Sequence, residues 1–118
     1  MGNKKIYIIG TGLSAEDISS YALKIISRAE VLIGGKRQLG YFNGHRGIGI
    51  ELKSNINNLA GKIKKKYDNK KTVVLASGDP NFFGIASTFY KAFPKNRIEI
   101  IPNITAFQGA FARIKEPW

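Results

Sequence analysis

The sequence has no cysteine and a single histidine, His45. The missing thiols exclude disulfides, cysteine nucleophiles and cysteine-ligated metals, and one histidine excludes a histidine-rich metal site, so we expect no metal. No apolar run approaches the roughly 18 residues that a membrane-spanning helix needs. A strand pattern begins almost at the first residue, which leaves no room for a signal peptide. We therefore expect a cytoplasmic protein with no segment that spans a membrane.

Acidic residues are also scarce. Eight Asp and Glu stand against nineteen Lys and Arg, and the formal charge is +11. A balance this basic indicates an anionic partner, for which nucleic acid, an acidic membrane surface and a small polycarboxylate remain open. The 118 residues suffice for one ordinary domain, residues 1–118, and are too few for two.

Apolar, β-rich runs alternate along the chain with segments whose apolar residues recur at helical spacing. The runs predict strands at residues 5–9, 31–33, 48–52, 72–76 and 97–101, of which the third is the weakest. The helical spacing predicts helices over 18–29, 56–67, 83–93 and 105–114, and the stretch 36–46 is interpreted as a polar connection. Ser19, Ser20 and Ser54 are candidate helix caps. The alternation predicts an α/β fold: an open, mainly parallel sheet with helices on both faces.

Three loops follow the carboxyl ends of predicted strands, where ligands bind in open α/β sheets. They are residues 10–14, 77–80 and 102–106. The first, Gly10-Thr11-Gly12, lacks the third glycine of the dinucleotide-binding pattern, and no acidic residue follows the second strand. A plain strand-to-helix turn is an equal alternative there, and an unrelated nucleotide-binding α/β domain is disfavoured. In the second loop, Asp79 is either a ligand contact or a helix cap.

Lysines cluster at residues 62–71, which is typical of a solvated helix face. His45 is interpreted as a surface residue. The phenylalanines have core-like spacing, and Phe82 alone is held open because it follows the Gly-Asp-Pro turn. A basic nucleic-acid-binding module is the alternative function, but the basic residues are mostly Lys and no aromatic residues interleave with Arg. Nucleic acid is thus not the expected partner.

Taken together, the loops resemble the signatures of the tetrapyrrole (corrin/porphyrin) methylase family. That family has Gly-x-Gly-Pro-Gly where this chain has Gly-Thr-Gly-Leu-Ser at 10–14, and Pro-Gly where this chain has Pro102-Asn103. The most specific match is Ala-Ser-Gly-Asp-Pro-Asn-Phe-Phe-Gly at 76–84. Residues 29–37 and the final Pro117-Trp118 resemble the branch that methylates C5 of a precorrin or cobalt-precorrin in cobalamin biosynthesis.

The resemblance implies that the chain is the N-terminal domain of a methylase that binds S-adenosylmethionine in a cleft between two domains. The implied cofactor contacts are Leu13, Ser77, Gly78, Asp79, Phe82, Thr105 and Ala106. Lys36 and Arg37 are candidate substrate contacts, with a solvated loop as the equal alternative. The macrocycle is the nucleophile of the implied SN2-like transfer, so positioning replaces an activated side chain, and no catalytic residue is assigned.

The family's second domain has no counterpart in the chain. We therefore expect weak cofactor binding and little or no turnover from the chain alone. The resemblance also implies a homodimer and a C15-methylating decarboxylase as a potential partner.

Overall fold

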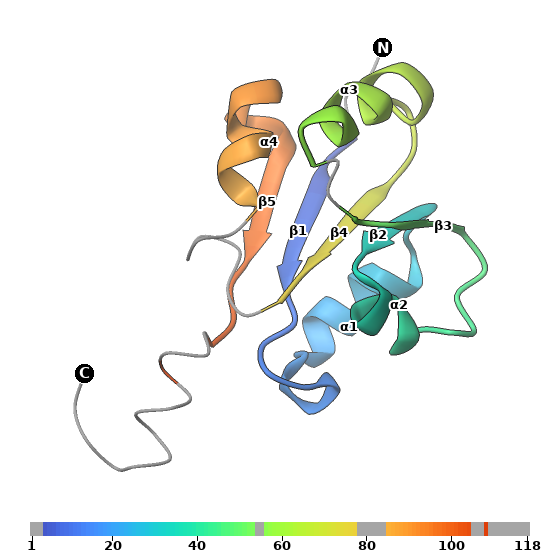
Figure 1. The fold of residues 1–118 in the computed structure, drawn as a ribbon, viewed down its shortest axis with the longest axis vertical. Helices are drawn as coiled ribbons and strands as arrows, with labels where there is room; N and C mark the ends of the chain where they lie inside the picture. Colours follow the sequence, from blue (N-terminus) through green and yellow to red (C-terminus); the bar gives the residue numbers. More distant parts are fainter. Residues whose placement is uncertain (1–3, 54–55, 78–84, 105–107, 109–118) are drawn as a thin grey trace.

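A computed structural model describes residues 4–53, 56–77, 85–104 and 108. Its centre is a five-stranded sheet in the order β3-β2-β4-β1-β5, and every neighbouring pair is parallel (Figure 1). The strands are β1 (Ile6–Gly10), β2 (Val31–Gly34), β3 (Ile48–Glu51), β4 (Thr72–Ala76) and β5 (Ile98–Ile101). The three central strands β2, β4 and β1 are almost entirely buried, as expected for a parallel sheet that is covered on both faces.

Side chains alternate across the strands and form a separate core on each face of the sheet. On one face, Ile8, Ile33 and Val74 pack with residues of α3 (Ile56–Lys66) and α4 (Ala86–Ala92). On the other, Ile9 and Leu75 pack with residues of α1 (Ser20–Ser27). The helices therefore lie on both faces, and the predicted fold class is confirmed.

Local sequence explains where the helices begin. The Ser19 hydroxyl accepts a hydrogen bond from the Ala22 N–H at 3.1 Å, which confirms Ser19 as a cap, whereas Ser20 is the first residue of α1. Two short 3-10 helices, η1 (Ala15–Asp17) and η2 (Lys95–Arg97), precede α1 and β5. No helix in the described part of the chain is long and apolar enough to cross a membrane.

The structure corrects three of the predicted elements. The helix predicted over 18–29 is shorter, because α1 runs from Ser20 to Ser27 and the backbone of Ile18 is extended. Residues 36–46 are not only a polar connection, because they contain the short helix α2 (Lys36–Gly40), whose Gln38 is buried. Arg97 belongs to η2, so the last strand begins at Ile98 instead. The other strand predictions are confirmed within one residue at each end. The predicted cap Ser54, the start of the 83–93 helix and most of the 105–114 helix lie outside the described residues.

Candidate functional site

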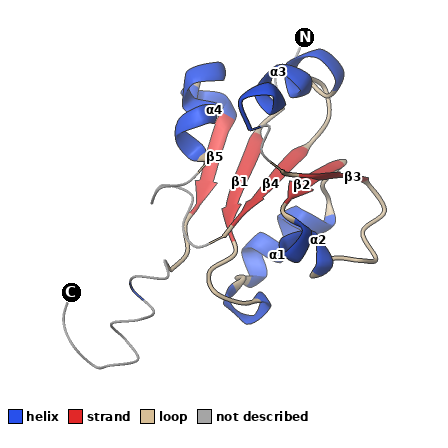
Figure 2. Ribbon diagram, viewed as in Figure 1, coloured by secondary structure: helices blue, strands red, loops and turns tan. Residues whose placement is uncertain are grey.

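Three neighbouring strands of the sheet end at one edge. Gly10 of β1 is in register with Ala76 of β4, and Ile9 is in register with Ile101 of β5. The strand arrows of β4, β1 and β5 accordingly point to the same end of the molecule (Figure 2). We call this edge, with residues 10–14, 77 and 102–104, the carboxyl rim. The expected convergence of the three loops is thus confirmed for their described residues.

The loop after β1, residues 11–14, is tied first to β4. The main-chain N–H and the hydroxyl of Thr11 both donate to the carbonyl oxygen of Ala76, at 2.8 and 3.0 Å. Thr11 is buried, with 2% of its surface exposed. Because both of its donors are used internally, Thr11 holds the first residue of this β1 loop against the end of β4.

Gly12 turns the β1 loop back toward η1. Its φ of +68° lies in the left-handed region, which glycine adopts without steric penalty. There is no room for a side chain, since a Cβ at this position would lie 2.5 Å from the Asp17 Cβ and 2.8 Å from the Asn103 Oδ1. The turn at Gly12 is therefore packed directly on two polar side chains.

Asp17, in η1, accepts hydrogen bonds from the main chain of the β1 loop. One carboxylate oxygen, Oδ2, accepts hydrogen bonds from the N–H groups of Leu13 and Ser14, at 2.7 and 3.1 Å. Hydrogen bonds to a charged acceptor are among the stronger ones in proteins. The carboxylate thus fixes the direction of two successive peptide units at the rim.

Asn103 joins the β1 loop to the end of β5. Its amide nitrogen donates to the carbonyl oxygens of Gly10, at 3.0 Å, and Asp17, at 2.8 Å. Its amide oxygen accepts from the N–H of Ile104 at 2.8 Å. One side chain therefore links β1, η1 and the segment that follows β5.

The two predicted substrate contacts, Lys36 and Arg37, are exposed in the first turn of α2, beside the rim. A nitrogen of the Arg37 guanidinium donates to the Leu13 carbonyl oxygen, and its Nε donates to the Tyr41 hydroxyl at 2.9 Å. Arg37 therefore reaches the β1 loop directly. Its predicted contact with substrate stays a prediction, as does that of Lys36.

Of the predicted cofactor contacts, the structure brings Leu13 and Ser77 to the rim, where Leu13 is half-buried and Ser77 is exposed. The others, Gly78, Asp79, Phe82, Thr105 and Ala106, lie outside the described residues. Sequence reasoning missed the roles of Asp17 and Asn103. Ser14 followed three residues later by an acidic residue is the spacing of a helix-start motif, and this pattern could have identified Asp17.

Basic side chains are unevenly distributed around the sheet. The described rim residues, 10–14, 77 and 102–104, include no Lys, Arg or His. Lys36 and Arg37 follow the neighbouring strand β2, and Lys53 follows β3. By contrast, Lys64–Lys66 end α3, shortly before β4 begins, and Figure 1 shows α3 at the opposite end of the strands. The lysine cluster of α3 is therefore not part of the rim.

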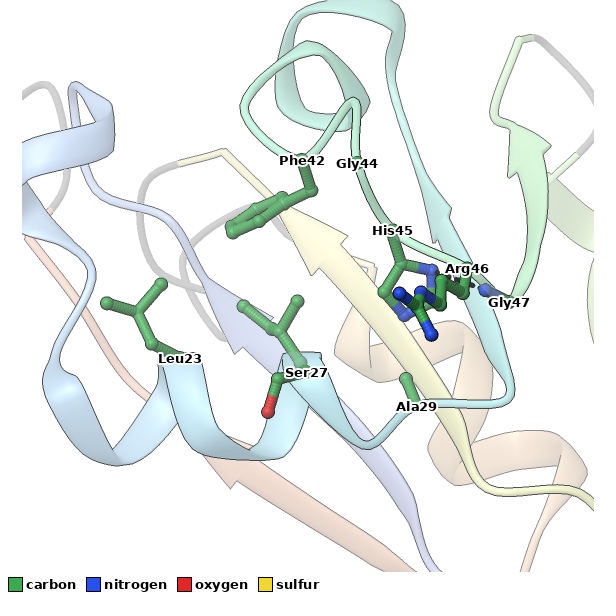
Figure 3. Close-up of a pocket in the computed structure, with 9 residues that line it drawn as sticks. Leu23, Ser27, Ala29, Phe42, Gly44, His45, Arg46 and Gly47 are labelled. Atoms are coloured by element: carbon green, nitrogen blue, oxygen red, sulfur yellow. Dashed lines mark hydrogen bonds between the residues drawn. The ribbon is translucent and has the colours of Figure 1, made fainter.

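A separate hollow of about 520 Å³ lies between α1 and the loop that leads into β3 (Figure 3). Leu23, Ile26 and Phe42 supply much of its apolar lining, and His45 and Arg46 line it as well. His45 is half-buried and its Nδ1 accepts from the Gly47 N–H at 3.1 Å. Among the described residues, none of the predicted cofactor or substrate contacts lines this hollow, so it is distinct from the described part of the rim.

The fold is an α/β domain with a parallel sheet, and its candidate ligand site lies at the carboxyl ends of the strands. The model of the family Tetrapyrrole (Corrin/Porphyrin) Methylases matches residues 5–118, and the chain belongs to this family. The chain is 38% identical over 120 residues to a probable cobalt-precorrin-7 C(5)-methyltransferase of Methanocaldococcus jannaschii, covering 96% of the chain and 56% of that protein. It is 37% identical over 102 residues to the cobalt-precorrin-7 C(5)-methyltransferase of Salmonella typhimurium, covering 86% of the chain and 50% of that protein.

Solved structures agree with this assignment. The cobalamin biosynthesis precorrin-6Y methylase of Archaeoglobus fulgidus matches with a TM-score of 0.81 and 27% identity, over 96% of this chain and 59% of that one. A uroporphyrin-III C-methyltransferase of Thermus thermophilus, solved with S-adenosylhomocysteine, shares the fold with a TM-score of 0.70 and 19% identity, over 90% and 47%. The chain spans about half the length of the curated relatives it matches. These methyltransferases give no support to the nucleic-acid-binding alternative.

Proposed function

We propose that the chain is the N-terminal half of an S-adenosylmethionine-dependent methyltransferase that acts on C5 of a precorrin or cobalt-precorrin in cobalamin biosynthesis. The observation that carries this proposal is the arrangement of the rim: the three loops with family signatures follow adjacent parallel strands and begin at one edge. The two cobalt-precorrin-7 C(5)-methyltransferases among the relatives support the choice of substrate.

The described part of the rim is compatible with the methyl donor. S-adenosylmethionine supplies a methyl group on a positively charged sulfonium, and a Lys or Arg in direct contact would repel that charge. The described rim residues carry no basic side chain although the chain has a formal charge of +11. Leu13 and Ser77 are the described residues that we assign to the cofactor. Gly78, Asp79, Phe82, Thr105 and Ala106 complete the proposed contacts.

The substrate is assigned to the side of the rim at β2 and β3. Lys36, Arg37 and Lys53 follow these two strands, and precorrins carry acetate and propionate groups that cations attract. An Arg fork can also hold a carboxylate through two hydrogen bonds. The described donor loops thus carry no basic side chain of their own, and the basic side chains proposed for the substrate follow β2 and β3, from where Arg37 reaches the Leu13 carbonyl oxygen.

The proposed site is incomplete without a second domain. Relatives about twice as long as this chain support a division in which residues 1–118 form one half of the cleft. We also propose that the assembled enzyme is a homodimer and that a C15-methylating decarboxylase acts with it. No catalytic side chain is assigned, because the chain's part is to bind the donor, orient it and exclude water.

Calorimetric titration with S-adenosylhomocysteine tests the proposal. The chain should be titrated alone and then with the separately produced C-terminal half of the Methanocaldococcus jannaschii relative. We expect weak binding by the chain alone and tighter binding in the mixture. An equal titration with ATP serves as the control, since a general nucleotide-binding domain would prefer the triphosphate. Absence of S-adenosylhomocysteine binding in both samples would reject the proposed function.

A further inference from the structure

The β1 loop has little conformational restraint of its own. Gly12 belongs to the most flexible residue type, and neither Leu13 nor Ser14 is proline or β-branched. A loop of this composition samples many conformations unless other groups hold it, and a ligand that binds it must then bear the ordering entropy. Thr11 is tied to β4 by its own two hydrogen bonds, so the restraint on residues 12–14 must come from other parts of the chain.

Asp17 supplies the first part of that restraint. Its Oδ2 accepts from the N–H groups of Leu13 and Ser14, at 2.7 and 3.1 Å, and the main-chain N–H of Asp17 donates to the Ser14 carbonyl oxygen at 3.0 Å. Two adjacent peptide units are thus fixed by one carboxylate oxygen. The Leu13 carbonyl belongs to the second of these units and is left to accept from Arg37.

Asn103 supplies the second part, from the other end of the sequence. Its amide nitrogen donates to Gly10, which precedes the loop, and to Asp17, which follows it. Both ends of the loop are therefore held by one amide group. Only Asn combines two donors and an acceptor on so short a side chain, and the acceptor is also used, by Ile104.

The two side chains and Gly12 fit together as one unit. A Cβ at Gly12 would lie 2.9 Å from the Asp17 Oδ2 and 2.8 Å from the Asn103 Oδ1, so both polar groups pack on the glycine backbone. Removing either side chain would leave the turn unsupported on that side. We call this arrangement of Asp17, Asn103 and Gly12 the loop clamp.

We propose that Asp17 and Asn103 are positioning residues of the methyl-donor site, which hold the β1 loop in the shape that binds the donor. This inference rests on the proposed function, because it assigns the loop to the donor pocket. The clamp orders the loop before the donor binds, so that the binding free energy is not reduced by the entropy of ordering the loop. Neither residue needs to touch the donor.

The test uses the isotopically labelled 118-residue chain, with NMR measurements of amide hydrogen exchange and of S-adenosylhomocysteine binding. In Asn103→Asp the isosteric side chain keeps its acceptor and loses both donors. We expect the Leu13 and Ser14 amides to exchange about tenfold faster and the S-adenosylhomocysteine dissociation constant to rise about tenfold. Asn69→Asp makes the same charge change at an exposed residue after α3 and should change neither value.

Further variants separate positioning from folding and charge. Asn103→Ala removes the donors without adding charge and should behave like Asn103→Asp. Asp17→Asn keeps an oxygen that can accept from Leu13 and Ser14, so it should retain most of the affinity that Asp17→Ala loses. Slow exchange of the Val74 and Leu75 amides in β4 will show that the sheet is intact in each variant. If a variant of Asn103 unfolds, the Asp17 pair decides the question.

Each result of this experiment is decisive. Unchanged exchange at Leu13 and Ser14 in both Asn103 variants would overturn the clamp. Faster exchange with unchanged S-adenosylhomocysteine affinity would overturn its role in positioning. If the unsubstituted chain does not bind S-adenosylhomocysteine even with the C-terminal half added, the proposed function fails, and the positioning role fails with it. Exchange then still decides whether the clamp orders the loop.

Discussion

The guanidinium of Arg37 donates a hydrogen bond to the main-chain carbonyl oxygen of Leu13, which lies 24 positions earlier in the chain. The same guanidinium reaches the Tyr41 hydroxyl through its Nε at 2.9 Å. Arg37 therefore connects α2, where the substrate is proposed to bind, with the loop that is proposed to bind the donor. A residue placed to hold a substrate carboxylate also supports the donor loop.

This contact predicts that Arg37→Ala weakens S-adenosylhomocysteine binding even when no substrate is present. We expect a three- to tenfold higher dissociation constant, because a charged donor to the loop is lost, at about 1 kcal/mol. The dissociation constant of Arg37→Lys should lie between those of the wild type and Arg37→Ala, since one ammonium cannot reproduce the two hydrogen bonds of the guanidinium. Lys36→Ala removes the same charge from the neighbouring residue and is the control. Equal affinities of the Arg37→Ala and Lys36→Ala chains would leave Arg37 with a role toward substrate alone.

Gly12→Ala should be destabilising. Its φ of +68° is strained for alanine, and the added Cβ would approach the Asp17 Cβ to 2.5 Å. We expect a loss of about 1–3 kcal/mol in the free energy of unfolding, measured by urea denaturation. Gly61→Ala is the matched control in α3, where a Cβ meets nothing within 4 Å. Because alanine favours helix over glycine, that variant should instead gain about 0.5–1 kcal/mol. A Gly12→Ala chain as stable as the wild type would contradict the packing of the clamp.

The strands could be predicted from sequence because the sheet is buried on both faces. Residues 72–76 form an uninterrupted β-rich run with almost every side chain buried, so the apolar pattern marked the strand to the residue. The α2 helix could not be found in this way. It has five residues, ends in Gly40 and buries the polar Gln38, so its buried position carries no hydrophobic signal.

The location of the site followed from the order of the elements, but the bonds that shape it did not. Loops after adjacent parallel strands must share an edge, and this brought residues 10–14 and 102–104 together. The link from Asn103 to Gly10 and Asp17 spans 93 and 86 positions and depends on the angle of one amide group. Asn103 could be recognised only as a residue tolerant of turn geometry, because no local pattern specifies a distant acceptor.

The stability of the chain should depend on pH through Glu30, which directly precedes β2 at the amino-terminal end of the strands. The Lys71 N–H donates to its carboxylate at 2.8 Å and lowers the pKa of Glu30 from its ordinary value of 4.5, with Lys4 contributing. A lowered pKa in the folded chain means that the stabilisation is complete above about pH 4.5 and is lost as the pH falls through the folded value. Glu30→Gln should therefore melt below the wild type at pH 7.

The difference between the two chains should then shrink toward zero on acidification below pH 4.5, since the protonated carboxyl resembles the amide. Thermal melts of both chains between pH 7 and pH 3 measure this difference in melting temperature. Glu16→Gln removes a charge from an exposed acid of η1 and serves as the control for net charge. A difference that stays constant across this range would show that the Glu30 charge does not contribute.

Arg97 joins the start of β5 to the start of β1 and to the loop after α3. Its side chain is only 15% exposed, and Nη1 donates to the Asp68 carboxylate at 3.0 Å. Nε and Nη2 both donate to the Lys4 carbonyl oxygen, at 3.2 and 3.0 Å, and the guanidinium lies 5.4 Å from the centre of the Phe93 ring. These contacts differ from an exposed ion pair because the fork serves a main-chain carbonyl and a carboxylate together. Truncating the side chain would therefore remove contacts with a main-chain carbonyl, a carboxylate and an aromatic ring.

Arg97→Ala should lower the free energy of unfolding by about 1.5–3 kcal/mol, the range for hydrogen bonds to a charged group. Arg97→Lys should recover less than half of that loss, because an ammonium can pair with Asp68 but cannot reproduce the two hydrogen bonds to Lys4. Lys62→Ala, on the exposed side of α3, should change stability by less than about 0.5 kcal/mol. Urea denaturation at low and high salt completes the test. If added salt removed most of the difference between the wild-type chain and the Arg97→Lys chain, screened charge and not fork geometry would be the cause.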